Sequence, residues 1–146
     1  MAASLQPDLS DRPLKLAVER VMVASPAALF QAWTRQFDRW LAAPGSVLME
    51  ADMNRVFYFE TDLEGRRHPH YGRFLRLQAD ALVEMTWVTT ATFGAETVVT
   101  VEPRHESAGE RLRLTHSGFP NEDSLDRLEK AWPSFLERLD RCLTGA

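Results

Sequence analysis

Hydrophobic and polar residues alternate along most of this chain, and this period of two is typical of strands with one buried face. The first alternating stretch covers residues 14–23. Six more stretches follow after residue 46, separated by turn-forming residues such as Glu64-Gly65. These six cover residues 47–53, 55–61, 70–78, 82–90, 96–102 and 110–117. The pattern therefore predicts one strand, a gap, and then six strands.

Helical spacing replaces the alternation in three places. Ser25 and Pro26 predict a helix start, because serine accepts a hydrogen bond from a free amide and proline at the first position needs no partner. A second, short helix is expected at residues 36–42 and a long one at residues 122–143, where apolar residues recur every three or four positions. The apolar stripe of the long helix consists of Leu125, Leu128, Trp132, Phe135, Leu136, Leu139 and Leu143.

These elements together predict an α+β fold in the order strand, two helices, six strands and one long helix. A helix with a single apolar stripe must bury that stripe, and the alternating strands offer a matching apolar face. We therefore expect a curved antiparallel sheet that wraps around the C-terminal helix. Residues 1–13 lack either period, so we expect a flexible N-terminal tail there and a single domain at residues 14–146.

Composition narrows the class of protein. The 146 residues carry a formal net charge of -4, which argues against a general nucleic-acid binder, because such proteins need a basic face. The one cysteine, Cys142, cannot form an internal disulfide. No stretch approaches the ~20 apolar residues of a membrane helix, and the N-terminus lacks a signal-peptide pattern. We expect a cytoplasmic protein with no membrane insertion.

The period of two also sorts the side chains into an inward and an outward set. Glu84 marks the outer face of residues 82–90, so Met85 and Trp87 are expected to point inward, as His116 does on residues 110–117. The inward set either encloses an apolar chamber beside the long helix or forms a fully packed core. The expected pocket residues are Trp33, Trp40, Phe57, Phe59, Met85, Trp87, Val99, Leu112, Leu114, His116, Trp132, Phe135 and Leu136.

Several segments of the chain resemble those of a known family. They are residues 24–34 (ASPAALFQAWT), 72–75 (GRFL), 82–87 (LVEMTW) and 114–119 (LTHSGF), followed by Ala131-Trp132. In order and spacing they are similar to the bacterial proteins named after the activator of heat-shock protein 90 ATPase, in the START-like (SRPBCC, Bet v 1-like) superfamily. This resemblance implies a helix-grip fold.

Few side chains are candidates for chemistry. His116 could act as an acid or base with Glu60 if the protein is an enzyme, but a satisfied core histidine is the favoured alternative. His68-Pro69-His70 lacks a third ligand and lies beside Arg66-Arg67, so we expect a loop with solvated histidines, no metal and no cofactor. Arg20 either faces the chamber to hold a carboxylate or lies in solvent at the end of its strand.

The leading functional hypothesis is a START-like domain that binds a small apolar or amphipathic molecule and has no recognisable catalytic motif, which favours a protein that is not an enzyme. Two alternatives remain: a cavity enzyme of the polyketide cyclase or dehydratase type, and a co-chaperone that stimulates a heat-shock protein 90 ATPase. A homodimer through exposed edge strands or the outer sheet face is a further expectation, because Phe74 has no evident inward place.

Overall fold

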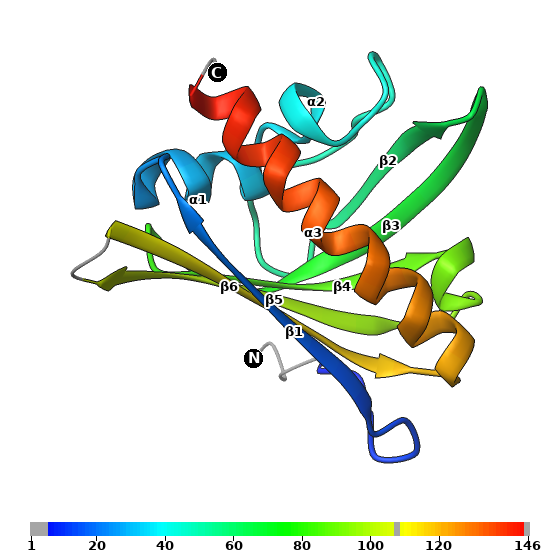
Figure 1. Cartoon of the computed structure of the whole chain (residues 1–146). Helices are drawn as coiled ribbons and strands as arrows, with labels where there is room; N and C mark the ends of the chain where they lie inside the picture. The colour runs from blue at the N-terminus through cyan, green and yellow to red at the C-terminus, as the bar shows by residue number, and fades with distance from the viewer. Residues whose placement is uncertain (1–5, 107–108, 145–146) are drawn as a thin grey trace.

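One curved antiparallel sheet of six strands organises residues 6–106 and 109–144, which are the residues that the computed structural model describes. The order of strands across the sheet places β1 beside the last strand and leaves β2 at the opposite edge (Figure 1). The order is β1-β6-β5-β4-β3-β2. The strands are β1 (Leu14–Met22), β2 (Val56–Leu63), β3 (Arg66–Gln78), β4 (Leu82–Thr89), β5 (Thr97–Glu106) and β6 (Gly109–Phe119).

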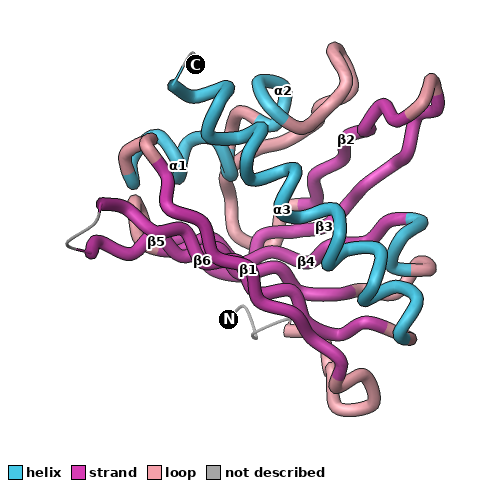
Figure 2. Tube along the Cα trace, viewed as in Figure 1, coloured by secondary structure: helices cyan, strands magenta, loops and turns pink. Residues whose placement is uncertain are grey.

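The helices cover the concave face of this sheet (Figure 2). The long helix α3 (Glu122–Thr144) lies across the sheet, while α1 (Pro26–Thr34) and α2 (Phe37–Trp40) lie near its C-terminal end. A short 3-10 turn, η1 (Thr90–Thr92), follows β4. None of the described helices has the length and apolar content needed to span a bilayer.

Side-chain hydrogen bonds hold the helical layer near the junction between β1 and α1. The hydroxyl of Ser25 accepts the amide hydrogen of Ala28 at 3.1 Å, which confirms the predicted start of α1. Near the other end of the chain, the carboxylate of Asp140 in α3 accepts the amide hydrogens of Val23 and Ala24 at 3.0 and 3.2 Å. This carboxylate therefore joins the C-terminal half of α3 to the junction between β1 and α1.

The structure confirms the predicted α+β helix-grip fold, with one strand fewer than expected. Residues 47–53 form no strand and make only isolated bridges, at Leu48 with Tyr58 and at Met53 with Phe74. Leu48 and Met53 are exposed, and Asn54 adopts a left-handed conformation with φ of 61° that ends the extended run. The segment therefore adds no strand to the sheet.

The four tryptophans meet in the core between α3, the short helices and β4. The ring centroids of Trp33 and Trp40 lie 4.9 Å apart, those of Trp33 and Trp132 6.0 Å, and those of Trp87 and Trp132 5.3 Å. Each of the four side chains is at most 1% exposed. The sequence-based expectation that Trp87 points inward, toward the long helix, is confirmed.

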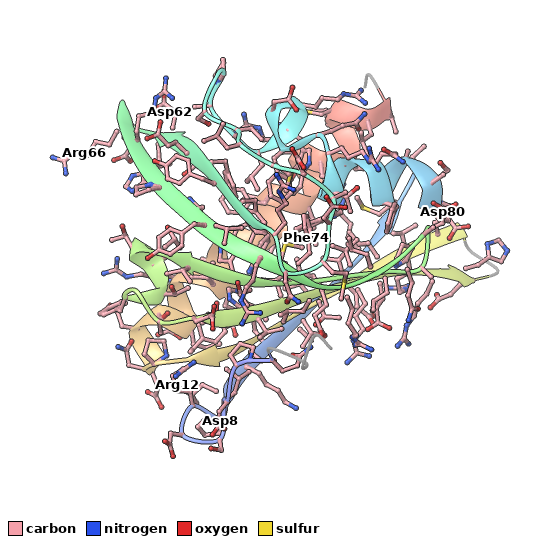
Figure 3. The ribbon with its side chains drawn as sticks, turned by 180° about the vertical axis from the view of Figure 1, so that it is seen from behind. Asp8, Arg12, Asp62, Arg66, Phe74 and Asp80 are labelled. Carbon is pink, nitrogen blue, oxygen red and sulfur yellow. The ribbon has the colours of Figure 1, made fainter. Side chains whose placement is uncertain are left out.

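A bulge in β3 explains why the faces of this strand were hard to assign from the sequence. The register with β4 shifts between Phe74 and Arg76, so inward residues are even-numbered before the shift and odd-numbered after it. Phe74 is fully buried and its ring lies 5.2 Å from that of Phe57 (Figure 3). The argument for a dimer that rested on an outward Phe74 is therefore wrong.

Gly72 in β3 lies very close to the backbone of β4, and we predict that this position tolerates no side chain. A Cβ atom at this position would overlap the carbonyl oxygen of Thr86 and lie 2.9 Å from the ring of Phe57. Because a backbone atom cannot move aside cheaply, Gly72→Ala is expected to lower the free energy of unfolding by about 3 kcal/mol. Urea denaturation measures this change, and Arg66→Ala at an exposed position of β3 is the control. Equal stabilities of the two variants would contradict the close approach.

Part of the N-terminal segment lies against the outer face of the sheet. The guanidinium of Arg12 donates to the carbonyl oxygens of Gly118 and Glu96 at 2.8 and 2.7 Å, and Gln6 donates to the carboxylate of Glu84 at 3.1 Å. Burial raises the pKa of Glu84, but its hydrogen bonds, with that from Arg76 the strongest, lower it overall below its ordinary value. Residues 1–5 lie outside the described residues, and the tail and its boundary at residue 13 stay predictions.

Candidate functional site

A cleft of about 370 Å³ opens between the N-terminal half of α3 and the end of the sheet formed by β2, β3 and β4. The turn η1 closes one end of it. Its lining is mainly apolar and aromatic, with a few hydroxyl and imidazole groups and one charged side chain. The lining residues are Thr61, Leu63, His68, His70, Trp87, Thr89, Thr90, Ala91, Arg127, Leu128, Ala131 and Phe135.

Strand register brings the sheet-side residues of the cleft together. His70 pairs with Phe59 on one side and with Thr89 on the other, while His68 pairs with Thr61. These directly opposed residues share the inward face of the sheet. Pairing between β3 and β4 begins at His70, so residues 66–69 pair with β2 alone. The far wall of the cleft is therefore a two-stranded ribbon that extends beyond β4, with Asp62 and Arg66 near its tip (Figure 3).

Two of the predicted pocket residues, Trp87 and Phe135, line this cleft. The others are at most 1% exposed, lie in the core and are not among the residues that line the cleft. They are Trp33, Trp40, Phe57, Phe59, Met85, Val99, Leu112, Leu114, His116, Trp132 and Leu136.

His116 is a fully hydrogen-bonded core histidine. The indole N–H of Trp132 donates to its Nδ1 at 3.0 Å, so Nδ1 carries no proton and Nε2 must carry it. Nε2 lies 2.7 Å from the hydroxyl of Thr97, whose own hydrogen is directed to the carbonyl oxygen of Trp87. Burial lowers the pKa of His116 to about 3. The favoured alternative from the sequence, a satisfied core histidine, is confirmed.

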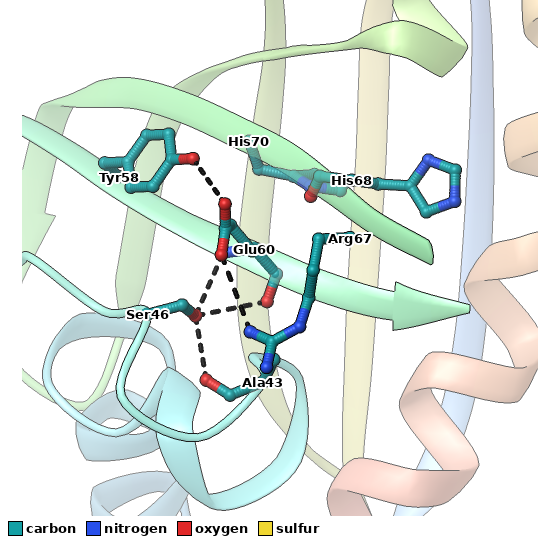
Figure 4. Close-up of polar contacts among 7 residues, drawn as sticks. All are labelled: Ala43, Ser46, Tyr58, Glu60, Arg67, His68 and His70. Carbon is teal, nitrogen blue, oxygen red and sulfur yellow. Dashed lines mark hydrogen bonds and ion pairs between the residues drawn. The ribbon is translucent and has the colours of Figure 1, made fainter. Parts of the chain in front are cut away.

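Glu60 lies on the outer face of β2 and does not meet His116. Its carboxylate accepts the hydroxyl hydrogen of Tyr58 at 2.9 Å and lies 3.5 Å from the guanidinium of Arg67. Figure 4 shows this outer cluster, in which the hydroxyl of Ser46 also accepts the backbone N–H of Glu60 at 3.0 Å. The hydrogen bond to Glu60 is the main cause that raises the pKa of Tyr58. The structure therefore does not bring the predicted acid–base pair together.

The expectation of a loop with solvated histidines is wrong for His70. The β2–β3 turn is made by Glu64 and Gly65, both in left-handed conformations with φ of 54° and 77°, so β3 begins already at Arg66. His70 is 8% exposed, and its ring stacks on Phe59 at 4.8 Å. Counting inward positions backward from Gly72 in steps of two would have identified His70 as an inward residue from the sequence.

His70 is held in one tautomer. Its Nδ1 lies 3.0 Å from the backbone carbonyl oxygen of His68. Because a carbonyl oxygen only accepts hydrogen bonds, Nδ1 carries the proton and Nε2 carries the lone pair. Burial lowers the pKa of His70 to about 4, although the hydrogen bond to His68 acts in the opposite direction. The ring is therefore neutral at neutral pH.

Two further polar groups bear on the chemistry of the cleft. The indole N–H of Trp87 is buried without a hydrogen-bond acceptor among the described residues. Arg127 pairs with Asp123 at 3.2 Å, and its guanidinium lies 5.6 Å from the ring centroid of Phe93. No cluster of three or more histidine, cysteine, aspartate or glutamate side chains suited to a metal occurs in the described parts of the chain.

Arg20 does not reach the cleft. It shares the helix-facing side of β1 with Leu16 and Met22, and its Nε atom is buried without a partner among the described residues. Arg20 therefore lies on the inward face, as the first alternative from the sequence expected, but it is not among the residues that line the cleft.

Comparison with known proteins agrees with the fold. The model of the family "Activator of Hsp90 ATPase homolog 1-like protein" matches residues 23–144. Protein CV1439 of Chromobacterium violaceum has a similar structure at 20% identity, with a TM-score of 0.76 over 88% of this chain and 96% of that one. No curated protein matches the chain.

Two further solved structures have the same fold. Protein MLL2253 of Mesorhizobium loti is 21% identical, with a TM-score of 0.72 over 91% of this chain and 98% of that one. Protein SA2116 of Staphylococcus aureus, described as of unknown function, is 14% identical, with a TM-score of 0.71 over 90% and 94% of the two chains. Because the family model covers most of the chain, this protein belongs to the family of activator of Hsp90 ATPase homolog 1-like proteins.

Proposed function

We propose that this protein binds a small apolar or amphipathic molecule in the cleft between α3 and strands β2–β4. The observation that carries the proposal is the cleft of about 370 Å³ with its aromatic and aliphatic lining. Binding sites for small molecules usually have volumes of about 300–1,000 Å³, so this cleft is at the small end of the range. A compact molecule of one or two rings fits this volume better than a long-chain lipid.

Burial of apolar surface supplies the driving force for binding. Leu63, Ala91 and Phe135, which line the cleft and are not fully buried, present apolar surface to it. Covering such surface stabilises a complex by about 25 cal/mol per Å², less the cost of ordering the ligand. The few polar groups of the lining orient the ligand within this apolar site.

A bulky side chain that fills the cleft is expected to weaken ligand binding strongly. Ala131 lines the cleft from α3, and the indole of an Ala131→Trp variant would occupy the space that a ligand needs. We expect its affinity for an apolar fluorescent dye to fall at least about tenfold, a loss of roughly 1.4 kcal/mol of binding free energy. Dye titration measures the change, and native mass spectrometry of the purified protein identifies a bound molecule.

The control for this test is Ala27→Trp, which introduces the same side chain at an exposed position of α1. Its dye affinity should equal that of the wild type. Equal losses in both variants, or no dye binding by the wild type, would contradict the proposal.

A catalytic role in the same cleft is the second candidate, and His70 is the observation that favours it. Its neutral imidazole is positioned by the carbonyl of His68 and is one of the two imidazoles of the lining that can accept a proton. A substrate screen with the wild type and His70→Phe distinguishes the two candidate functions. Turnover that depends on His70 supports an enzyme, and ligand binding without turnover supports a binding protein.

A further inference from the structure

His70 presents a hydrogen-bond acceptor to the cleft. Nδ1 lies next to the strand and donates to the carbonyl of His68, which leaves Nε2 at the far edge of the inward-pointing ring. Nε2 has no hydrogen-bond partner among the described residues, and it is not one of the unpaired polar atoms that the protein seals from solvent. The lone pair of this atom is therefore available to a molecule in the cleft.

The ring of His70 cannot turn this lone pair away. It stacks on Phe59 with an interplanar angle of 19° and meets Trp87 edge to face at a centroid distance of 5.4 Å. Rotation of the imidazole about χ2 would break the hydrogen bond to His68 and collide with one of these rings. The packing therefore holds the acceptor in one direction.

The other polar groups of the cleft favour a neutral ligand over an anionic one. Arg127 is the one charged side chain of the lining, and its guanidinium is already paired with Asp123 and placed over Phe93. A carboxylate beside the lone pair of His70 would lose its water shell and find an acceptor where it needs a donor. The N–H of Trp87 is sealed from solvent, so it offers no donor to a molecule in the cleft. A neutral hydroxyl group can donate to the lone pair of His70 without the cost of burying a charge.

We propose that the ligand of this protein is a neutral, compact aromatic or cyclic molecule with a hydroxyl group, a phenol or an alcohol, whose O–H donates to Nε2 of His70. This inference rests on the proposed binding function and names its ligand class. The apolar body of the ligand lies against Trp87 and Phe135, and its hydroxyl group reaches the floor of the cleft.

Three probes that differ in one group test this proposal. Naphthol has the hydroxyl group, methoxynaphthalene keeps the oxygen but lacks the hydrogen, and naphthoate is an anion at neutral pH. The wild type should bind naphthol about tenfold more tightly than methoxynaphthalene, the usual contribution of one hydrogen bond, and should bind naphthoate most weakly. Titration by tryptophan fluorescence or calorimetry measures the three affinities.

Two variants test whether the preference for naphthol over methoxynaphthalene depends on Nε2 of His70. His70→Phe keeps an aromatic ring between Phe59 and Trp87 and lacks the acceptor, so naphthol and methoxynaphthalene should bind it equally. His105→Phe makes the same change at an exposed histidine of β5 that does not line the cleft, and should retain the preference of the wild type. Nitrogen NMR of the wild type needs no variant: the Nε2 resonance of His70 should be that of an unprotonated nitrogen and should shift with naphthol only.

The outcomes separate the ligand class from the binding function. Equal affinities for naphthol and methoxynaphthalene in the wild type, a preference that persists in His70→Phe, or tightest binding of naphthoate would overturn the hydroxyl assignment while the binding function stands. Failure of the wild type to bind any of the three probes would overturn both.

Discussion

Replacing Trp132 with alanine is expected to lower the free energy of unfolding by about 5 kcal/mol. The indole is fully buried where α3 meets the sheet, with the rings of Trp33, Trp87 and Phe135 within 6.0 Å of its centroid. Removal of a buried aromatic side chain costs about 3–5 kcal/mol, and the loss of its N–H leaves Nδ1 of His116 unpaired at a further cost of about 1–3 kcal/mol. A loss of this size is comparable with the whole stability of many domains. Urea denaturation followed by circular dichroism measures it.

Two further variants divide this loss into its parts. Trp132→Phe retains most of the apolar surface and removes the donor to His116, so it should cost less than Trp132→Ala and more than about 1 kcal/mol. Lys130→Ala, at an exposed position of the same helix, should change the stability by no more than about 0.5 kcal/mol. A Trp132→Ala protein as stable as Lys130→Ala would show that α3 does not depend on this contact.

Acidification from about pH 7 to about pH 5 is expected to lower the free energy of unfolding by about 4 kcal/mol, because two histidines are buried in the neutral form. Burial lowers the pKa of His70 to about 4 and that of His116 to about 3, against 6.5 for an ordinary histidine. As the pH falls below 6.5, these two histidines therefore bind protons in the unfolded chain, while in the folded chain they stay largely unprotonated down to about pH 5. Stability is complete above pH 6.5 and is lost as the pH falls toward the two folded values.

Variants at the histidines test the origin of this pH dependence. His116→Gln can accept from Trp132 and donate to Thr97 without titrating, so the loss of stability between about pH 7 and about pH 5 should fall by about half. His105→Gln, which changes an exposed ring, should leave the loss unchanged. The lowered pKa of Glu84 adds an acid dependence only below the ordinary carboxyl value of 4.5, so it does not enter this window. An unchanged loss in His116→Gln would contradict the assignment.

The period of hydrophobic residues was sufficient to predict the architecture. The alternation is clearest in the strands that became β1 and β6, and the stripe through Leu128, Trp132 and Leu136 sets the buried face of α3. The prediction from the period of two was wrong for one segment and gave no clear faces for β3. Residues 47–53 have the composition of a strand, but a left-handed Asn54 and exposed Leu48 show a connecting segment. A single-residue bulge after Phe74 cannot be read from the sequence, because it depends on the register with β4.

The candidate site could be predicted only in part. Inward direction was correct for Trp87 and His116, yet direction alone does not tell whether a side chain meets a cavity or another side chain. Most inward residues fill the core, since α1 and α2 bring Trp33 and Phe37 against the same strands. The open space remains toward the other end of the sheet, where β2 and β3 extend beyond β4. The location of this cleft follows from strand lengths and turn types, which the period of two does not specify.

The two walls of the cleft, helix α3 and the β2–β3 ribbon, are held in place to different degrees. Helix α3 is fixed at both ends, by Asp140 at the β1–α1 junction and by the hydroxyl of Ser124, which donates to the carbonyl of Ala91 at 2.6 Å. The opposite wall, which carries Thr61 and His68, is the ribbon whose strands pair only with each other. Isolated two-stranded hairpins have little stability of their own. We therefore expect a molecule too bulky for the cleft to displace the hairpin of residues 61–69 more readily than helix α3.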